Sequence, residues 1–406
     1  MIQISEPESS KSTNGFKNHP FWQLPFRSFF IFASLASVFS ILAWFASLNG
    51  YLTLNSQGLL PITWHAHEMI FGFGITIAAG FILTAVQTWT GLPSIKGSPV
   101  IALLSLWLLI RLSLWVNNEY SLIAATVMQL IWWVIVISIF AKLVINSNNK
   151  RNYIFIPLFT VLACVQLTIL LASYFQQHNL AIHLTRSSVL LFTVVITLIG
   201  GRVIPFFTVR GAKTEAIAPS EKVESLILPA SIITALLYIV SYFFSSWAGN
   251  EPLQYLTGAV FITTGVIHFI RQARWRGLET FKVPLLWTLH LSYFAMGLGL
   301  VLVGFSYLLP ELPFTTGLHV ITVGTIGLMI LSMISRVSLG HTGRALEVKP
   351  IITFAFILMA VAAFVRVILP LVGLPLYGWN ISAIAWAIAF TCFVIVYWPI
   401  LSTPRK

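Results

Sequence analysis

Residues 66–89 read AHEMIFGFGITIAAGFILTAVQTW, an apolar run in which Glu68 is the one acidic residue and neither Lys nor Arg occurs. A helix needs about 20 mainly apolar residues to cross the hydrocarbon core of a bilayer. This run reaches that length, and a single chain segment in lipid can satisfy its own backbone hydrogen bonds only as a helix. The stretch therefore predicts a transmembrane helix.

The rest of the chain repeats this pattern. Of its 406 residues, 58% are hydrophobic and 8% are charged, whereas about a quarter of the residues of a soluble domain are charged. Runs long enough to span a bilayer cover residues 26–48, 66–89, 98–116, 121–145, 153–173, 182–206, 225–246, 252–270, 283–307, 314–335, 351–370 and 378–400. We predict an all-α, polytopic membrane protein with twelve transmembrane helices. Residues 26–401 form a single membrane domain in this prediction, between an N-terminal tail (1–25) and a C-terminal tail (402–406).

The basic residues predict the orientation of the helices. The chain has 23 Lys and Arg residues against 11 acidic residues, all of them Glu. Arg111, Arg186 and Arg366 fall inside predicted spans, and the other 20 basic residues lie in or beside alternate connecting segments, which include both tails. Cytoplasmic segments carry such an excess of Lys and Arg, so we expect both termini in the cytoplasm. The positive charge thus reflects topology, and nucleic acid is excluded as a partner.

The cysteines exclude two classes of site. Cys164 and Cys392 lie far apart within apolar runs, and neither a CxxC nor a CxxCH motif occurs. Four cysteines are needed for a typical iron–sulfur cluster, so that cofactor is excluded. A haem in this chain would be held noncovalently, because no attachment motif is present.

Histidine is the informative residue type within the predicted spans, because ionisable groups in a membrane are costly and mark functional sites. His65 and His67 stand at the outer entrance of the second span, and His183 begins the sixth. His290 and His319 lie within the ninth and tenth spans. Imidazole ligates metals and haem, relays protons, or links helices by hydrogen bonds. Imidazoles on several helices favour a ligand or relay role over hydrogen bonding alone.

The surroundings of these histidines differ. His65 and His67 are two residues apart and point about 200° away from each other on a helix, so we expect them to face different neighbours. Glu68 follows directly, and three roles are open to it: passing protons, orienting a histidine ring, or contacting solvent. We expect His268, at the cytoplasmic end of its helix, to lie at the membrane interface, and His341 to lie in a polar segment.

Two dense motifs lie on the predicted cytoplasmic side, GGRVIPFFT at residues 200–208 and SRVSLGHTGR at residues 335–344. Their glycines allow helices to approach closely, and Pro205 is expected to end or kink its helix. The guanidinium groups of Arg202 and Arg336 suit bidentate binding of carboxylates or phosphates. Haem propionates, lipid headgroups and Glu side chains are candidate partners for these arginines.

Taken together, these motifs resemble those of the NnrS family of bacterial inner-membrane proteins. The resemblance includes HPFW at residues 19–22, WHAHEMIFGF at residues 64–73, and both cytoplasmic motifs, and it spans about residues 19 to 400. It implies a multi-pass protein of the bacterial cytoplasmic membrane, containing noncovalent haem b and copper. It also implies a role in nitric oxide metabolism and nitrosative stress.

The resemblance and the residue pattern together predict two sets of site residues. The predicted cofactor-binding residues are His65, His67, His290, His319, Arg202 and Arg336. The predicted metal ligands are His65, His67, His183, His290 and His319, and Glu68 would orient a ligand or carry protons.

A fainter resemblance links the second and tenth spans to the haem–copper oxidases. The segment TWHAHEMIF at residues 63–71 is similar to the helix that supplies an axial haem ligand in those enzymes, which implies His65 as that ligand and His319 as its partner. This chain departs from the oxidases because it has no His-His pair and no histidine in its seventh span. The departure argues against a three-histidine copper site and against oxygen reduction, and it leaves haem binding intact.

These observations lead to one main hypothesis and two alternatives. The main hypothesis is a membrane b-type haem protein that binds nitric oxide or carries electrons, supplied by a respiratory donor or quinol. If it is an enzyme, it is a haem-dependent oxidoreductase of nitrogen oxides. The alternatives are a metal or proton permease that uses its intramembrane histidines, and an assembly factor for respiratory oxidases.

Overall fold

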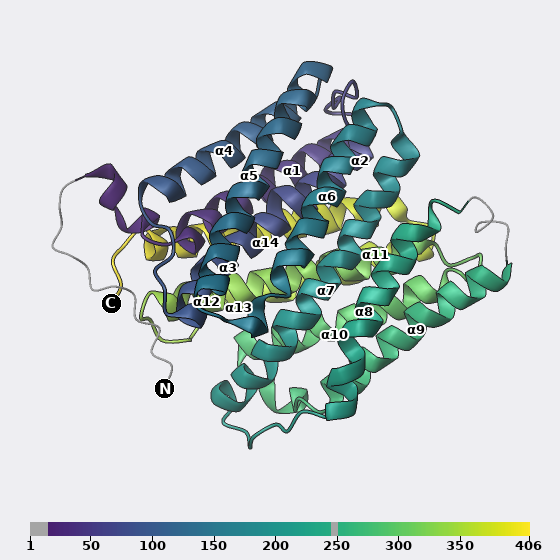
Figure 1. Ribbon diagram of the computed structural model, residues 1–406. Coiled ribbons are helices and arrows are strands. Elements are labelled where there is room, and N and C mark those ends of the chain that lie inside the picture. The colour runs from purple at the N-terminus through teal and green to yellow at the C-terminus, as the bar shows by residue number, and fades with distance from the viewer. Residues whose placement is uncertain (1–14, 245–250) are drawn as a thin grey trace. The chain divides into compact units, whose positions relative to one another are not determined.

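The computed structural model describes residues 15–244 and 251–406, and within these ranges the regular secondary structure is entirely helical (Figure 1). In this part of the chain, twelve helical stretches are long and apolar enough to cross a membrane. The predicted all-α class and the predicted number of spans are therefore confirmed. A chain with this many apolar helices fits a lipid bilayer as its surroundings.

The spans follow one another along the chain, joined by short connections. The first six are α1 (Pro25–Leu48), the stretch α2–η3–α3 (Pro61–His67, Glu68–Gly74, Ile75–Thr90), α4 (Ser98–Val116), α5 (Glu119–Asn146), η4 with α6 (Lys150–Asn152, Phe155–Tyr174) and α7 (His178–Gly211). The other six are α8 (Glu221–Ser241), α9 (Glu251–Ala273), α10 (Pro284–Phe305), the stretch α11–η7–α12 (Phe314–His319, Val320–Gly327, Leu328–His341), α13 (Pro350–Leu371) and α14 (Pro375–Leu401). Short turns of 3-10 helix are η1 (Phe16–Asn18), η2 (Pro20–Trp22) and η6 (Gly277–Thr280).

Some helices extend beyond the apolar runs that predict them. Helix α7 continues through Pro205 to Gly211, so of the two effects expected of Pro205, an end or a kink, the structure excludes the end of the helix. Helix α12 continues to His341, although the apolar run stops at residue 335. The reason is that hydropathy marks where apolar side chains stop, whereas a helix continues until its backbone hydrogen bonds stop.

Local sequence explains where several helices begin. Pro25, Pro61 and Pro284 occupy the first helical position of α1, α2 and α10, where a missing backbone N–H has no partner to lose. Helix α5 begins with a capping box: the side chain of Asn118 accepts from the backbone N–H of Ser121, and the Ser121 hydroxyl accepts from the Asn118 backbone. This arrangement satisfies two N–H groups that the helix leaves free.

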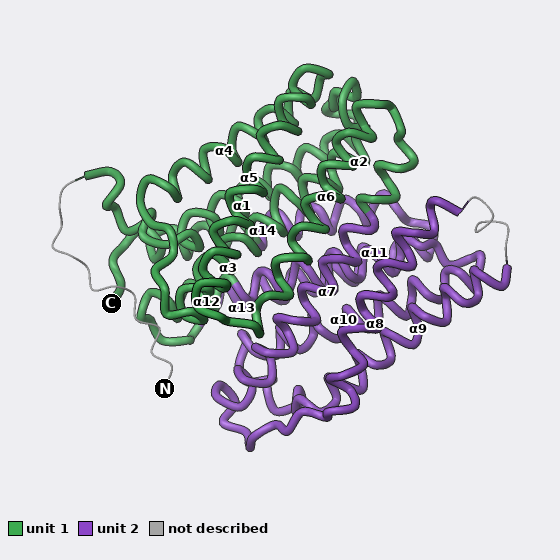
Figure 2. The backbone as a smooth tube through the Cα atoms, in the orientation of Figure 1, with its two compact units in different colours: residues 1–185, 334–347, 390–406 green, residues 186–333, 348–389 purple. Residues whose placement is uncertain are grey.

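The chain forms two compact units, coloured green and purple in Figure 2. Unit 1 comprises residues 1–185, 334–347 and 390–406, and unit 2 comprises residues 186–333 and 348–389. Helices α7, α12 and α14 each contribute residues to both units.

Within unit 2, glycines allow α9 and α10 to approach closely. A Cβ atom placed on Gly265 would lie 2.6 Å from the carbonyl oxygen of Gly297, and one on Gly304 would lie 2.6 Å from that of Gly258. No side chain fits at such distances, so these positions require glycine. Small residues at helix contacts of this kind are typical of membrane proteins, where close packing supplies much of the association energy.

Two spans are interrupted by π-helical turns, η3 in unit 1 and η7 in unit 2. The first turn begins directly after His67 and the second directly after His319. A π-helical turn shifts the angular position of the residues that follow it, and such turns occur frequently at functional sites. Both interruptions therefore coincide with histidines that the sequence predicts as ligands.

Large apolar side chains are exposed along several helices. On α5 they include Leu130, Ile131 and Val134, and on α13 they include Phe354 and Phe364. Apolar surface on this scale is unusual for a protein surrounded by water. It is the surface expected of a helix that faces lipid.

Candidate functional site

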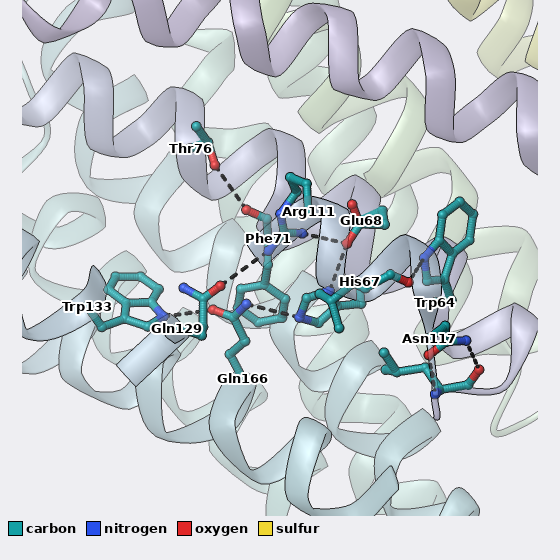
Figure 3. A network of polar contacts seen from close by, with 12 residues as sticks. Trp64, His67, Glu68, Phe71, Thr76, Arg111, Asn117, Gln129, Trp133 and Gln166 are labelled. Atoms are coloured by element: carbon teal, nitrogen blue, oxygen red, sulfur yellow. Dashed lines mark hydrogen bonds and ion pairs between the residues drawn. The ribbon is translucent and has the colours of Figure 1, made fainter. Parts of the chain in front are cut away.

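A buried ion pair lies at the start of η3 in unit 1. The Arg111 guanidinium, from α4, donates from Nη1 to Oε1 of Glu68 at 2.5 Å, and both side chains are almost fully buried (Figure 3). A second donor atom of Arg111, Nη2, reaches Oε1 of Gln129 on α5 at 3.2 Å. Of the three roles open to Glu68, the structure excludes contact with solvent, because the residue is buried.

Gly72, within η3, leaves room for this ion pair. A Cβ atom on Gly72 would lie 2.9 Å from Nη1 of Arg111 and 3.1 Å from Oε2 of Glu68. The first of these distances is shorter than side-chain carbon atoms adopt, so a side chain at this position would push the guanidinium away. Gly72 thus allows both partners to lie directly against the backbone of η3.

The ring of His67 joins the ion pair to a second chain of hydrogen bonds. Its Nδ1 lies 3.3 Å from Oε1 of Glu68, and its Nε2 lies 3.0 Å from Nε2 of Gln166 on α6. The indole N–H of Trp133, on α5, donates to Oε1 of Gln166 at 2.7 Å. Figure 3 shows these residues in one continuous network.

The network determines which nitrogen of His67 carries the proton. Trp133 can only donate, so the Gln166 atom that it contacts is the oxygen. The NH2 group of Gln166 then faces His67 and donates to Nε2, which must offer a lone pair. The ring is therefore neutral, and its Nδ1–H donates to the carboxylate of Glu68. This supports the role of Glu68 in orienting the histidine ring.

His65 lies in different surroundings, as its spacing from His67 predicts. Its ring is half-buried and stacks on Trp44 of α1, with ring centroids 4.6 Å apart and the planes 10° from parallel. The two neighbouring histidines thus contact different helices. His65 has an aromatic neighbour, whereas His67 has the carboxylate.

In unit 2, His319 has a comparable arrangement. Arg366, on α13, donates from Nη2 to Nε2 of His319 at 2.8 Å. Arginine is always a donor, so this nitrogen accepts and the other, Nδ1, donates to the backbone carbonyl of Thr315 at 2.6 Å. The Arg366 guanidinium also lies over the Trp379 ring, 5.3 Å from its centroid. His319 is therefore a neutral imidazole whose Nε2 is held by a neighbouring N–H.

His290 is another predicted ligand. Its Nε2 donates a hydrogen bond, whereas Nε2 of His67 and of His319 accepts one. The Thr208 hydroxyl donates to the carbonyl of Ile204 at 2.9 Å, so it accepts from Nε2–H of His290 at 2.8 Å. The other ring nitrogen, Nδ1, is buried and has no hydrogen-bond partner in the part of the chain that the structure describes. It faces Gly277, where a Cβ atom would lie 2.9 Å away.

Two other histidines near helix ends are buried. His268 is fully buried: its Nε2 lies 3.2 Å from the Ser231 hydroxyl of α8 and its Nδ1 2.8 Å from the Tyr293 hydroxyl of α10. Its expected place at the membrane interface stays a prediction. His341 is the last residue of α12, which continues past the apolar run into the polar segment, and it is buried there.

Close to His268, unit 2 holds a buried arginine, Arg271. Arg271 donates from Nε and Nη2 to the two carboxylate oxygens of Glu224, at 2.8 and 2.5 Å, and from Nη1 to the Tyr293 hydroxyl at 3.0 Å. A Cβ atom on Gly201 would overlap the Arg271 guanidinium. The GGRVIPFFT motif thus admits an arginine from another helix, a role that sequence alone did not suggest.

The remaining predicted site residues are spread over the chain. His183 is half-buried on α7 in unit 1, and Arg336 is buried on α12 in the same unit. Arg202 is half-buried on α7 in unit 2. Of the predicted set, the structure brings His67 and Glu68 into contact with each other.

The predicted metal ligands do not form a closed cluster. Within residues 15–244 and 251–406, no group of three or more His, Cys or Glu side chains is placed to hold a metal ion. His65, His67 and His183 belong to unit 1, and His290 and His319 belong to unit 2. The copper site and the pairing of His65 with His319 therefore stay predictions.

Sequence reasoning missed four partners of this site: Arg111, Gln129, Trp133 and Gln166. Two amides and one guanidinium inside apolar runs were the available signal, because polar groups within spans are rare and need partners. The indole of Trp133 carried no such signal, since tryptophan is common in membrane helices for reasons of packing alone.

Comparison with known proteins gives one family. The model of the family described as NnrS protein matches residues 20–405, nearly the whole chain. A search of curated proteins finds no match.

Proposed function

The chain belongs to the NnrS family, and from this membership we propose that it acts in nitric oxide metabolism or nitrosative-stress tolerance as a membrane haem protein. The family match over residues 20–405 carries the nitric oxide part of the proposal. The buried His67–Glu68–Arg111 network supports the haem part, because it contains an imidazole oriented by a carboxylate.

The residues around His67 fit the role of a ligand. A histidine that binds a metal through one nitrogen ordinarily donates its other N–H to a carboxylate or a carbonyl, which orients the ring and raises its basicity. His67 already donates Nδ1–H to Glu68, and Arg111 holds that carboxylate in place. We therefore assign the ligand role in the second span to Nε2 of His67 rather than to His65, which stacks on Trp44.

His319 is the proposed imidazole ligand of the tenth span. Its Nδ1–H is bonded to the Thr315 carbonyl, which is the second common way of orienting a metal-bound histidine. A haem held by either imidazole would supply an iron that binds nitric oxide or exchanges an electron with a respiratory donor or quinol. The chain's residues would orient the ligands and exclude water from them.

The haem proposal is tested by optical spectroscopy. The protein is expressed with ample haem, purified in mild detergent, and its reduced-minus-oxidised spectrum recorded alongside haem and metal analysis. We expect a stoichiometric b-type spectrum that is lost in His67→Ala and kept in His65→Ala. A protein that contains no haem under these conditions contradicts the proposal. The same metal analysis tests for copper, which enters through the family resemblance.

One observation favours the second candidate, a proton or metal permease. An intramembrane carboxylate in contact with an imidazole, as in Glu68 and His67, is also the arrangement of proton pathways in transporters. Reconstitution in liposomes containing a pH-sensitive dye distinguishes the two. Proton or metal flux that Glu68→Gln abolishes would support the permease, and its absence together with a haem spectrum would support the haem protein.

A further inference from the structure

We propose that Gln166 is a positioning residue that occupies Nε2 of His67 in the state described and must move away before this nitrogen can take a ligand. The inference rests on the proposed function, since it concerns the same imidazole. It adds a gate to the site: the ligand atom is present, but its lone pair already accepts a hydrogen bond.

The amide of Gln166 fits between Trp133 and His67 in one orientation only. Its Oε1 accepts from the indole N–H of Trp133 at 2.7 Å. If the amide flipped, its NH2 group would face that N–H, and its oxygen would face a ring nitrogen that offers a lone pair. Both contacts would then be repulsive, and a shift of the His67 proton to Nε2 would relieve only the contact with His67.

Moving Gln166 has a cost that reaches beyond His67. Trp133, His67 and Gln166 are all buried, so an amide that rotates away leaves the indole N–H without a partner. An unsatisfied buried donor is unfavourable. Ligation at His67 is therefore coupled to the contact between α5, which carries Trp133, and α6, which carries Gln166.

The same arrangement recurs in unit 2. Nε2 of His319 accepts from Arg366, as Nε2 of His67 accepts from Gln166. Each histidine is followed directly by a π-helical turn. Two predicted ligands thus share one state, a neutral ring whose Nε2 is held by a side-chain N–H. The recurrence indicates that holding this nitrogen is a feature of the site rather than an accident of packing.

The adjacent residue Trp132 supplies a matched control. Trp132 and Trp133 are both buried, with ring centroids 5.3 Å apart. The indole N–H of Trp132 has no hydrogen-bond partner in the described chain, whereas that of Trp133 holds Gln166. Trp133→Phe and Trp132→Phe remove similar volumes, but only the first removes the anchor of the gate.

The first test needs no haem. Nitrogen-15 NMR of histidine-labelled, haem-free protein in lipid reports which ring nitrogen of His67 carries the proton. We expect a proton on Nδ1 and a hydrogen-bonded lone pair on Nε2 in the wild type and in Trp132→Phe. In Gln166→Leu the signal of Nε2 should move downfield, because the bond it accepts is lost. A wild-type His67 with its proton on Nε2 would overturn the gate, as would an unchanged signal in Gln166→Leu.

The second test measures ligand affinity by titrating the haem-free protein with hemin. We expect Gln166→Leu and Trp133→Phe to bind hemin about three- to tenfold more tightly than the wild type. In Gln166→Leu no hydrogen bond to Nε2 of His67 has to be broken. In Trp133→Phe that bond is weaker, because Gln166 has lost the indole N–H that holds it. Trp132→Phe should bind as the wild type does, and His67→Ala should lose this binding.

The outcomes separate the gate from the proposed function. If hemin binds through His67 and Gln166→Leu has wild-type affinity, the gate is wrong and the proposed function stands. If neither the wild type nor any variant binds hemin, the proposed function is wrong, and so is a gate for haem. Equal tightening in Trp132→Phe and Trp133→Phe would also overturn the gate, because packing alone would then explain the effect.

Discussion

Arg111 Nη1 lies 2.5 Å from Glu68 Oε1, and this buried ion pair links α4 to the first residue of the π-helical turn η3. Sequence analysis places Arg111 inside a span without assigning it a role. In the structure it balances the carboxylate of Glu68 beside His67, the proposed ligand of unit 1. The pair allows Glu68 to remain charged in a buried position, where an isolated carboxylate would be very unfavourable.

Replacing Arg111 is therefore expected to destabilise the protein. Arg111→Met removes the partner of a buried carboxylate, and breaking such a pair costs about 3–5 kcal/mol. The measurement is the free energy of unfolding in mixed micelles, followed by tryptophan fluorescence. The double variant Arg111→Met with Glu68→Gln should recover part of the loss, because the uncompensated charge is gone. A double variant as unstable as the single one would contradict the ion-pair explanation.

The adjacent glycines of the GGRVIPFFT motif provide a sharper contrast. A Cβ atom on Gly201 would overlap the Arg271 guanidinium, whereas one on Gly200 would lie 3.4 Å from the nearest atom of Tyr293. Gly201→Ala should therefore disturb the Arg271–Glu224 pair and destabilise the protein by about 3 kcal/mol. Gly200→Ala should change the stability by about 1 kcal/mol or less, since it adds an ordinary contact and a better helix former. Thermal unfolding of the two variants tests the contrast, and equal effects would refute it.

The pH dependence of stability should contain a contribution from Tyr307, which lies between α10 and α11. Burial raises the pKa of Tyr307, with a further increase from nearby Tyr238 and an opposing effect of Arg186. A group whose pKa is higher in the folded protein stabilises it below the unfolded pKa of about 10, and this contribution is lost as the pH rises beyond that value. Above that pH, stability should fall by about 1.4 kcal/mol per pH unit from this group alone.

The measurement is the free energy of unfolding of the wild type and of Tyr307→Phe at pH values from about 9 to 11, a range around the ordinary pKa of tyrosine. The phenylalanine variant should show a shallower decrease with pH, because it has no hydroxyl to ionise. Tyr51→Phe is the control, since Tyr51 is 80% exposed. If Tyr51→Phe and Tyr307→Phe change the slope equally, burial of Tyr307 is not the cause.

The spans could be predicted from the sequence because every helix that crosses a bilayer needs a run of apolar residues of a minimum length. The divergence of His65 and His67 also followed from helix geometry alone. The interior partners could not be predicted in this way. The contact of Arg111 with Glu68 depends on how α4 packs within unit 1, and the room for it depends on Gly72, which apolar composition does not single out.

Burial near helix ends depends on the same packing. His341 lies in a polar segment beyond its apolar run, yet it is the last residue of α12 and is buried. His268 lies near the end of a predicted span and is also buried, with partners on α8 and α10. Hydropathy describes contact with lipid, whereas burial among helices depends on which residues face one another.

The last prediction concerns the guanidinium that holds His319. Arg366 Nη2 donates to Nε2 of His319 at 2.8 Å, so Arg366→Met should leave that lone pair without its donor. Arg186 is the matched residue, because it also lies within a span of unit 2 but places its guanidinium over the Phe314 ring, 5.5 Å from the centroid. Nitrogen-15 NMR should show the His319 Nε2 signal moving downfield in Arg366→Met and staying in place in Arg186→Met. Nδ1 should keep its proton in both variants, because the Thr315 carbonyl accepts it. A proton found on Nε2 of wild-type His319 would contradict the arrangement, since arginine has no lone pair to accept it.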